Sequence, residues 1–370
     1  MTDPRVTNLA KILVNYSTKV QPGDKVMIRG FPLQPVGAPL VREVYREVLL
    51  AGGLPITYIG LEGLRYIRLT YANEEQLQYV DPISKMSLEE FDVEIRITAT
   101  TNSQELSNVD PANYELVTRS YAELMQVFME RSAKGELRWV ATRYPTKAFA
   151  QDAEMSLVEF EDFFYRITFA DLDDPIEAWK EVSRKQQGII QWLKGKDHVE
   201  LRGPNADLEF RIGDRPFINC DGDANMPDGE IFTAPIEDSI NGWIRFGYTA
   251  LNGGVGVEGV ELHFENGKVV SASAEKNEDF LLKILDTDKG ARYVGEFGIG
   301  TNDMIDRYTK IGLFDEKTGG TIHLALGGGY PESGSKNKSA IHWDMICDMR
   351  DGGEIIVDNE LLYRSGKFQV

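Results

Sequence analysis

The chain has 370 residues, 42% of them hydrophobic, and carries a formal net charge of −19 with a pI of about 4.8. This length exceeds what one hydrophobic core usually covers, so two domains are expected. The excess of acidic side chains excludes nucleic acid and anionic membrane surfaces as partners, because both would repel the chain. It suits a protein that meets cations, metal ions or substrates with a positive amine.

Cysteine usage and hydropathy predict a cytoplasmic protein. The chain has two cysteines, Cys220 and Cys347, and no CxxC pair, which favours a reducing compartment. No apolar run reaches the length of a membrane span. The first 20 residues also lack the apolar core of a signal peptide.

Helical and strand patterns alternate in the first part of the chain. Helical spacing is found over residues 8–20, 39–53, 114–135, 157–167 and 174–195. Strands are expected over residues 25–30, 55–60, 91–100 and 137–145. This alternation predicts an α/β N-terminal domain in which helices cover a mostly parallel sheet.

The pattern changes near residue 195. Short runs of alternating hydrophobicity follow, with turn residues between them, and Asn266-Gly267 has the composition of a tight hairpin turn. We therefore predict two domains: an α/β domain over residues 1–195 and a mainly antiparallel β (α+β) domain over residues 196–370.

Two glycine-rich stretches resemble nucleotide motifs but fail on context. Gly254–Gly259 fits GxGxxG, yet a strand pattern follows it where a dinucleotide site needs a helix. Gly329–Gly334 has P-loop glycine spacing, but Lys-Ser/Thr does not follow directly. The HExxH motif of helix-borne zinc sites is absent from the sequence.

Candidate metal ligands cluster in the last 150 residues, each beside a turn, a glycine or an apolar strand. Imidazole and carboxylate groups are the usual ligands of zinc, cobalt and manganese. The candidates are Glu230, Glu296, His323, His342 and Asp344, with Tyr330 just past a glycine bend.

The spacing of His342 and Asp344 has a geometric consequence. Residues i and i+2 of a strand point to the same face, so both can serve one site while Trp343 and Met345 fill the opposite face. Taken alone, such a pair is more often a hydrogen-bonded pair at a sheet surface than a pair of metal ligands. Together, two Glu, two His and one Asp suffice for two ions that share a bridging carboxylate.

Four motifs in this order resemble one enzyme family. They are PDGEIFTAP (227–235), GEFGIGTN (295–302), IHLALGGGY (322–330) and SAIHWDM (339–345). Residues 9–28 and 174–182 look like the same family, so the likeness covers nearly the whole chain. The family is that of the metallo-aminopeptidases called aminopeptidase T, aminopeptidase S and aminopeptidase II.

The resemblance implies a dimeric metalloprotease that removes the N-terminal residue of peptides with a free N-terminus. It implies an α/β N-terminal domain and a C-terminal domain with a dinuclear centre and a metal-activated water. It assigns Glu230, Glu296, His323, His342 and Asp344 as metal ligands and Tyr330 as the family's tyrosine, which we also count among the metal ligands. As catalytic residues we expect Glu230 or Glu296 as the general base and Tyr330 as a donor to the developing oxyanion. Zinc, cobalt, manganese and magnesium remain open as the two ions.

Other functions and residues remain open from the sequence. A different two-metal hydrolase, such as an amidase or phosphoesterase, could use the same ligand types, as could a non-enzymatic metal-binding protein. Lesser candidates are Glu237, Asp238, Lys336 and Lys338, while His198 and His263 are expected to be ordinary strand or surface histidines. The loop between Tyr330 and His342 is shorter than in many members of the family, so we expect it to influence substrate preference.

Overall fold

The structure is a computed structural model that describes residues 3–33 and 35–370. The chain divides into two compact units. The first unit comprises Met1–Trp179 and Gly222–Pro227, and the second comprises Lys180–Asp221 and Asp228–Val370. The boundary expected near residue 195 lies just after helix α10 (Pro175–Leu193), and its role as a folding boundary stays a prediction.

A five-stranded parallel sheet forms the core of the first unit. Its order is β2-β1-β3-β4-β8, and every neighbouring pair is parallel. The strands are β1 (Lys25–Leu33), β2 (Leu54–Ile59), β3 (Val93–Ala99), β4 (Arg138–Arg143) and β8 (Asn225–Met226). Branched residues such as Val26, Ile28 and Ile95 are completely buried, as expected where helices cover a parallel sheet. The predicted α/β arrangement is therefore confirmed.

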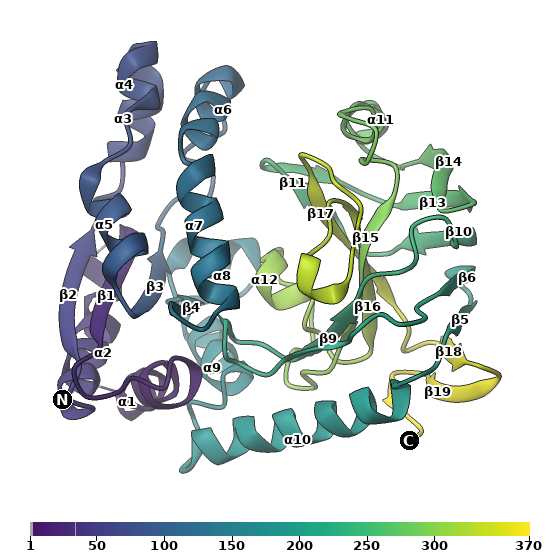
Figure 1. Cartoon of the computed structure of the whole chain (residues 1–370), viewed down its shortest axis with the longest axis horizontal. Helices are drawn as coiled ribbons and strands as arrows, with labels where there is room; N and C mark the ends of the chain where they lie inside the picture. Colours follow the sequence, from purple (N-terminus) through teal and green to yellow (C-terminus); the bar gives the residue numbers. More distant parts are fainter. Residues whose placement is uncertain (1–2, 34) are drawn as a thin grey trace. The chain divides into compact units, whose positions relative to one another are not determined.

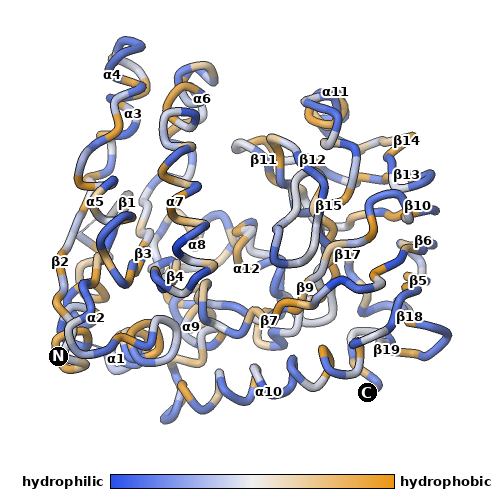
Figure 2. The backbone as a smooth tube through the Cα atoms, viewed as in Figure 1, coloured by the Kyte–Doolittle hydropathy of each residue, from blue (hydrophilic) through white to orange (hydrophobic). Residues whose placement is uncertain are grey.

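Short helices accompany this sheet. They are α1 (Pro4–Lys11), α2 (Ala38–Leu50), α3 (Leu64–Tyr71), α4 (Glu74–Gln78), α5 (Pro82–Glu90), α6 (Pro111–Ser120), α7 (Ala122–Ala133), α8 (Lys147–Asp152) and α9 (Leu157–Ile167). Figure 1 shows α3 and α4 stacked in one column and α6 and α7 in another. Hydrophilic and hydrophobic colours alternate along these helices in Figure 2, as amphipathic packing requires.

Two predicted helices differ from the observed ones. The helix expected over residues 8–20 begins earlier, at Pro4, and continues from Ile12 to Ser17 as a π-helix. The helix expected over residues 114–135 is broken at Tyr121, where ψ is 1°. The hydroxyl of Tyr121 donates a hydrogen bond of 3.0 Å to Asp81, a long-range contact that helical periodicity does not contain.

The second unit contains two antiparallel sheets of eight and five strands. The eight-stranded order is β14-β13-β10-β6-β5-β18-β19-β20, and the five-stranded order is β17-β16-β15-β9-β7. The first sheet comprises β5 (His198–Gly203), β6 (Ala206–Arg211), β10 (Asn241–Phe246), β13 (Val260–Glu265), β14 (Lys268–Ser273), β18 (Glu354–Val357), β19 (Glu360–Arg364) and β20 (Lys367–Phe368). The second comprises β7 (Ile218–Cys220), β9 (Glu230–Thr233), β15 (Val294–Gly300), β16 (Thr321–Gly327) and β17 (His342–Asp348). A mainly antiparallel second part was predicted and is confirmed.

One face of the five-stranded sheet belongs to the hydrophobic core. The ring of Phe297 meets that of Phe210 from the other sheet edge-on, with centroids 4.9 Å apart. Trp343 and Met345 are 2% and 0% exposed, on the face predicted for them. Because strand residues alternate between faces, this core leaves the opposite face of β15, β16 and β17 for polar side chains.

The remaining elements of the second unit are short. They are α11 (Glu278–Leu285), α12 (Gly312–Asp315) and the two-stranded sheet of β11 (Ala250–Asn252) and β12 (Val255–Val257). The predicted hairpin is present, with Asn266 and Gly267 at φ of 49° and 81° between β13 and β14. Strand β13 follows Gly254–Gly259, in agreement with the rejection of a dinucleotide motif there. Among the described residues, no helix is both long and apolar enough to span a membrane.

Candidate metal centre

The polar face of the five-stranded sheet gathers five of the six predicted ligands, and the sixth, Tyr330, follows strand β16 three residues after its end at Gly327. Glu230 begins β9, Glu296 lies in β15 and His323 in β16, while His342 and Asp344 lie two residues apart at the start of β17. These strands are neighbours in the sheet, so residues more than 100 positions apart in sequence meet on one face.

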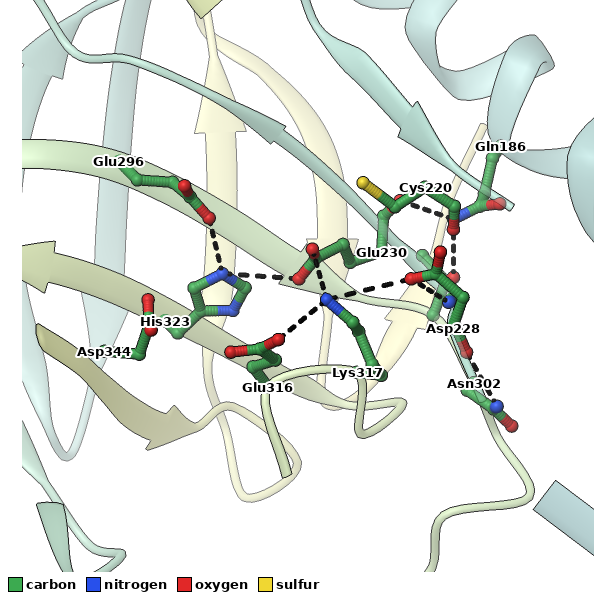
Figure 3. Close-up of polar contacts among 12 residues, drawn as sticks. Gln186, Cys220, Asp228, Glu230, Glu296, Asn302, Glu316, Lys317, His323 and Asp344 are labelled. Carbon is green, nitrogen blue, oxygen red and sulfur yellow. Dashed lines mark hydrogen bonds and ion pairs between the residues drawn. The ribbon is translucent and has the colours of Figure 1, made fainter. Parts of the chain in front are cut away.

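The imidazole of His323 lies between two carboxylates (Figure 3). Its Nε2 is 3.2 Å from Oε1 of Glu296 and 3.4 Å from Oε2 of Glu230. All three residues are buried, with His323 at 0% exposure.

A second imidazole approaches Glu296 from β17. Nε2 of His342 is 3.9 Å from Oε2 of Glu296 and 3.5 Å from Oδ1 of Asp344. The Nδ1 atom of His342 is 2.7 Å from the carbonyl oxygen of Gly328, to which it can donate a hydrogen bond. That hydrogen bond turns Nε2 toward the carboxylates, and metal-binding histidines are commonly oriented in this way through their other ring nitrogen.

A glycine on β15 makes room for the buried imidazole. Gly298 pairs with His323 across β15 and β16. A Cβ atom at residue 298 would overlap Cε1 and Nε2 of the His323 ring. His323 is thus the group that approaches β15 closely at this glycine.

Lys317 brings a buried positive charge to the centre (Figure 3). Its Nζ is 2.5 Å from Oε1 of Glu230, 2.8 Å from Oε1 of Glu316 and 3.7 Å from Oδ1 of Asp228. Only 1% of Lys317 is exposed, so these carboxylates must offset the cost of burying its ammonium group. The two oxygens of Glu230 therefore differ: Oε1 is hydrogen-bonded to Lys317, and Oε2 lies 3.4 Å from the His323 ring without a hydrogen bond to it.

The carboxylates change the protonation of both histidines. Burial by itself lowers the pKa of His323, but the hydrogen bond with Glu296 and the charge of Glu230 raise it to about 9. Burial likewise opposes the charge on His342, while Asp344 raises its pKa to about 10. Burial raises the pKa of Glu296. Without a metal ion, both imidazoles are thus protonated on both nitrogens at neutral pH. A bound cation would displace one of these protons.

The β17 end of the centre is the accessible end. The side chains of His342 and Asp344 are 31% and 27% exposed, against 1% for His323. Tyr330 lies at this end, where its ring meets that of His342 edge-on at 5.2 Å between centroids. Burial and the charge of Glu296 raise the pKa of Tyr330, which keeps its hydroxyl protonated.

The donor set fits divalent ions. Among the described residues, three groups have potential ligand atoms within 4.8 Å of one another. Two of them, Glu230–Glu296–His323 and Glu296–His342–Asp344, share Glu296, and the third is Cys220–Asp228–Glu230. Within the described parts of the chain, the buried Oε2 atoms of Glu230 and Glu296 have no hydrogen-bond partner. Buried polar atoms rarely lack a partner, and a cation would provide one for each. Carboxylate and imidazole ligands suit zinc, cobalt and manganese.

The lesser candidates lie outside these two groups. Glu237 pairs with Arg215 at 2.7 Å, and Asp238, Lys336 and Lys338 are exposed. His198 and His263 are 44% and 47% exposed and face acidic neighbours on the eight-stranded sheet. The expectation that both are ordinary strand histidines agrees with these positions.

Three charged residues around the centre escaped the sequence analysis: Asp228, Glu316 and Lys317. Asp228 is two residues before Glu230, and this spacing could have indicated it. Lys317 gave no such signal, because lysine is rarely buried and its contact with Glu230 spans 87 residues.

Comparison with known proteins identifies a metalloprotease family and its relatives. A family model described as thermophilic metalloprotease (M29) matches residues 2–368. Aminopeptidase 2 of Geobacillus stearothermophilus is 28% identical, over 97% of the chain and 96% of that protein. Aminopeptidase T of Thermus thermophilus is 25% identical, over 97% and 94% respectively. The resemblance found in the four C-terminal motifs is confirmed.

A solved structure shares the fold. Wild-type AmpT from Thermus thermophilus matches with a TM-score of 0.82 and 22% sequence identity, over 99% of both chains. The α/β part followed by a mainly antiparallel part is thus an arrangement already seen in a solved structure.

We predict that Gly298→Ala displaces His323 and weakens metal binding. The added methyl group would overlap the imidazole, which has no free space in a fully buried position. Bound zinc or cobalt, measured by elemental analysis after dialysis, should fall well below the wild-type content. Gly247→Ala is the matched control, because a Cβ there meets no atom within 4 Å. Wild-type metal content in Gly298→Ala would contradict the assigned role of this glycine.

Proposed function

The chain belongs to the M29 family of thermophilic metalloproteases and is a metallo-aminopeptidase, and we propose that it cleaves the N-terminal peptide bond at a centre of two divalent ions. The proposed ligands are Glu230, Glu296, His323, His342 and Asp344. The family match favours peptide bonds over phosphoesters as the substrate.

One observation supports two ions rather than one. The oxygens of Glu296 face different imidazoles, Oε1 toward His323 and Oε2 toward His342. A carboxylate in this position can bridge two cations. When bound, such ions would polarise the scissile carbonyl and lower the pKa of a water molecule.

The accessible end of the centre is where we place the substrate. Asp344 is partly exposed, and its hydrogen bond with His342 lowers the pKa of the Asp344 carboxyl to about 2. Asp344 is therefore negatively charged at neutral pH and can attract a free α-amine. Tyr330 keeps its proton and can donate it in a hydrogen bond to the oxygen on which negative charge develops. These two contacts would place the first peptide bond of the substrate beside the centre.

Glu316 is our proposal for the general base. Glu230 and Glu296 are proposed as metal ligands, whereas Glu316 lies outside both of their ligand groups and pairs with Lys317 through Oε1 at 2.8 Å. Burial raises the pKa of Glu316 to about 7, even though Lys317 lowers it. A carboxylate with a pKa near the working pH can take a proton from water and deliver it to the leaving amine.

We also propose that the protein is a cytoplasmic homodimer. The resemblance favours a homodimer, and the low cysteine content of the sequence favours the cytoplasm. The absence of a disulfide among the described residues is compatible with that location.

Hydrolysis should require a free N-terminus. We expect a leucyl peptide to be cleaved and its N-acetylated form to be cleaved about 30- to 1,000-fold more slowly, because acetylation removes the charge that Asp344 attracts. Product release measured by chromatography would check this ratio. A chelator should abolish cleavage, and cobalt, zinc or manganese should restore it. Equal rates on free and acetylated peptides would contradict an aminopeptidase.

Replacing Glu316 with Gln should separate catalysis from metal binding. We expect kcat to fall by about 10²- to 10⁴-fold, with the metal content unchanged, because the amide cannot accept the proton. The wild-type rate should decline as the pH falls below about 7 and Glu316 becomes protonated, and Glu316→Gln should lack this limb. Glu265→Gln, on an exposed strand position, is the control. Full activity in Glu316→Gln would show that another group is the base.

A further inference from the structure

A cavity of about 700 Å³ lies within the first unit, at the carboxyl ends of its parallel strands. Tyr58 of β2, Thr98 of β3 and Arg143 of β4 line it, and these residues lie at or near the last positions of their strands. Residues of α3 and α6, the two helices in the neighbouring columns of Figure 1, complete the wall. This volume is typical of sites for metabolite-sized ligands.

The strand order of the parallel sheet also predicts a ligand site at the position of this cavity. β2 and β3 lie on opposite sides of β1, so the order of the sheet reverses there. In open α/β sheets, ligands bind at the carboxyl ends of the strands beside such a reversal. The cavity therefore has the position of a ligand site, independently of the metal centre in the second unit.

Three of the charged side chains that line this cavity, Arg29, Arg68 and Asp81, have partners. Arg29 pairs with the buried Glu94 at 2.9 Å. Arg68 donates to the carbonyl oxygens of Leu77 and Tyr79. Asp81 accepts hydrogen bonds from Ser84 and from the hydroxyl of Tyr121.

Arg143 is different. Among residues 3–33 and 35–370, its guanidinium group has no hydrogen bond or ion pair, and its Nε is completely buried. Burial lowers the pKa of Arg143, with no carboxylate to offset the effect. Its nearest aromatic contact is the ring of Phe149, 6.0 Å from Cζ. A buried charge without a partner destabilises a protein, so a guanidinium in this position would be stabilised by an anion bound in the cavity.

We propose that this cavity binds a small molecule through a carboxylate or phosphate group paired with Arg143. The guanidinium fork matches the geometry of both oxyanions. The rings of Tyr58, Tyr114, Tyr121 and Phe149 also line the cavity and can contact an apolar or planar part of the ligand. Because the chain has a net charge of −19, an anion would bind here through local contacts rather than general attraction.

Calorimetric titration of the full-length wild-type protein with inorganic phosphate, ADP and succinate tests this site. At least one of these anions should bind, and Arg143→Met should weaken that binding by about 10- to 100-fold, the usual effect of losing a charged hydrogen bond. Arg42→Met, at an exposed position of α2 outside the cavity, should bind like the wild type. Binding of phosphate or ADP alone identifies a phosphate ligand, and binding of succinate alone identifies a carboxylate ligand; both support the site.

Thermal unfolding without added anion gives a second measurement. Arg143→Met should unfold at a higher temperature than the wild type, because it removes a buried charge that has no partner. A lower unfolding temperature would show that the guanidinium is already paired and would overturn the proposal. No binding of any of the three anions, or equal binding by Arg143→Met and the wild type, would also overturn it.

Discussion

The imidazole of His323 can lie between Glu230 and Glu296 because residue 298 has no side chain. Glu296 and Gly298 lie on the polar face of strand β15. The His323 ring, from β16, occupies the space that a Cβ atom at residue 298 would fill. The opposite face of both strands is fixed in the hydrophobic core by residues such as Phe297 and Leu324. The strands therefore cannot move apart to admit a larger residue without disturbing that core.

Charge balance is the second constraint on this centre. Five acidic residues meet there: Asp228, Glu230, Glu296, Glu316 and Asp344. Without a metal ion, Lys317 and the protonated forms of His323 and His342 are cations that face them. Divalent ions would replace those protons, while Lys317 keeps a permanent charge beside Glu230. Removing one member of such a set leaves buried charge uncompensated, which is usually strongly destabilising.

Strand periodicity explains how much of the site could be predicted from the sequence. The i, i+2 spacing of His342 and Asp344 correctly placed Trp343 and Met345 in the core, and alternating patterns predicted both sheet types. The features that the sequence did not predict depend on long-range contacts. Tyr121 bonds to Asp81 where a continuous helix was expected, and Lys317 reaches Glu230 across 87 residues. Local patterns carry no information about such pairs.

The central claim is that Glu296 joins two metal sites in one chain. It is tested most directly by titrating cobalt into metal-free protein and counting the bound ions by elemental analysis. The account predicts two ions per chain in the wild type. A saturating content of one ion would contradict a bridging role for Glu296, whatever the activity of the loaded protein.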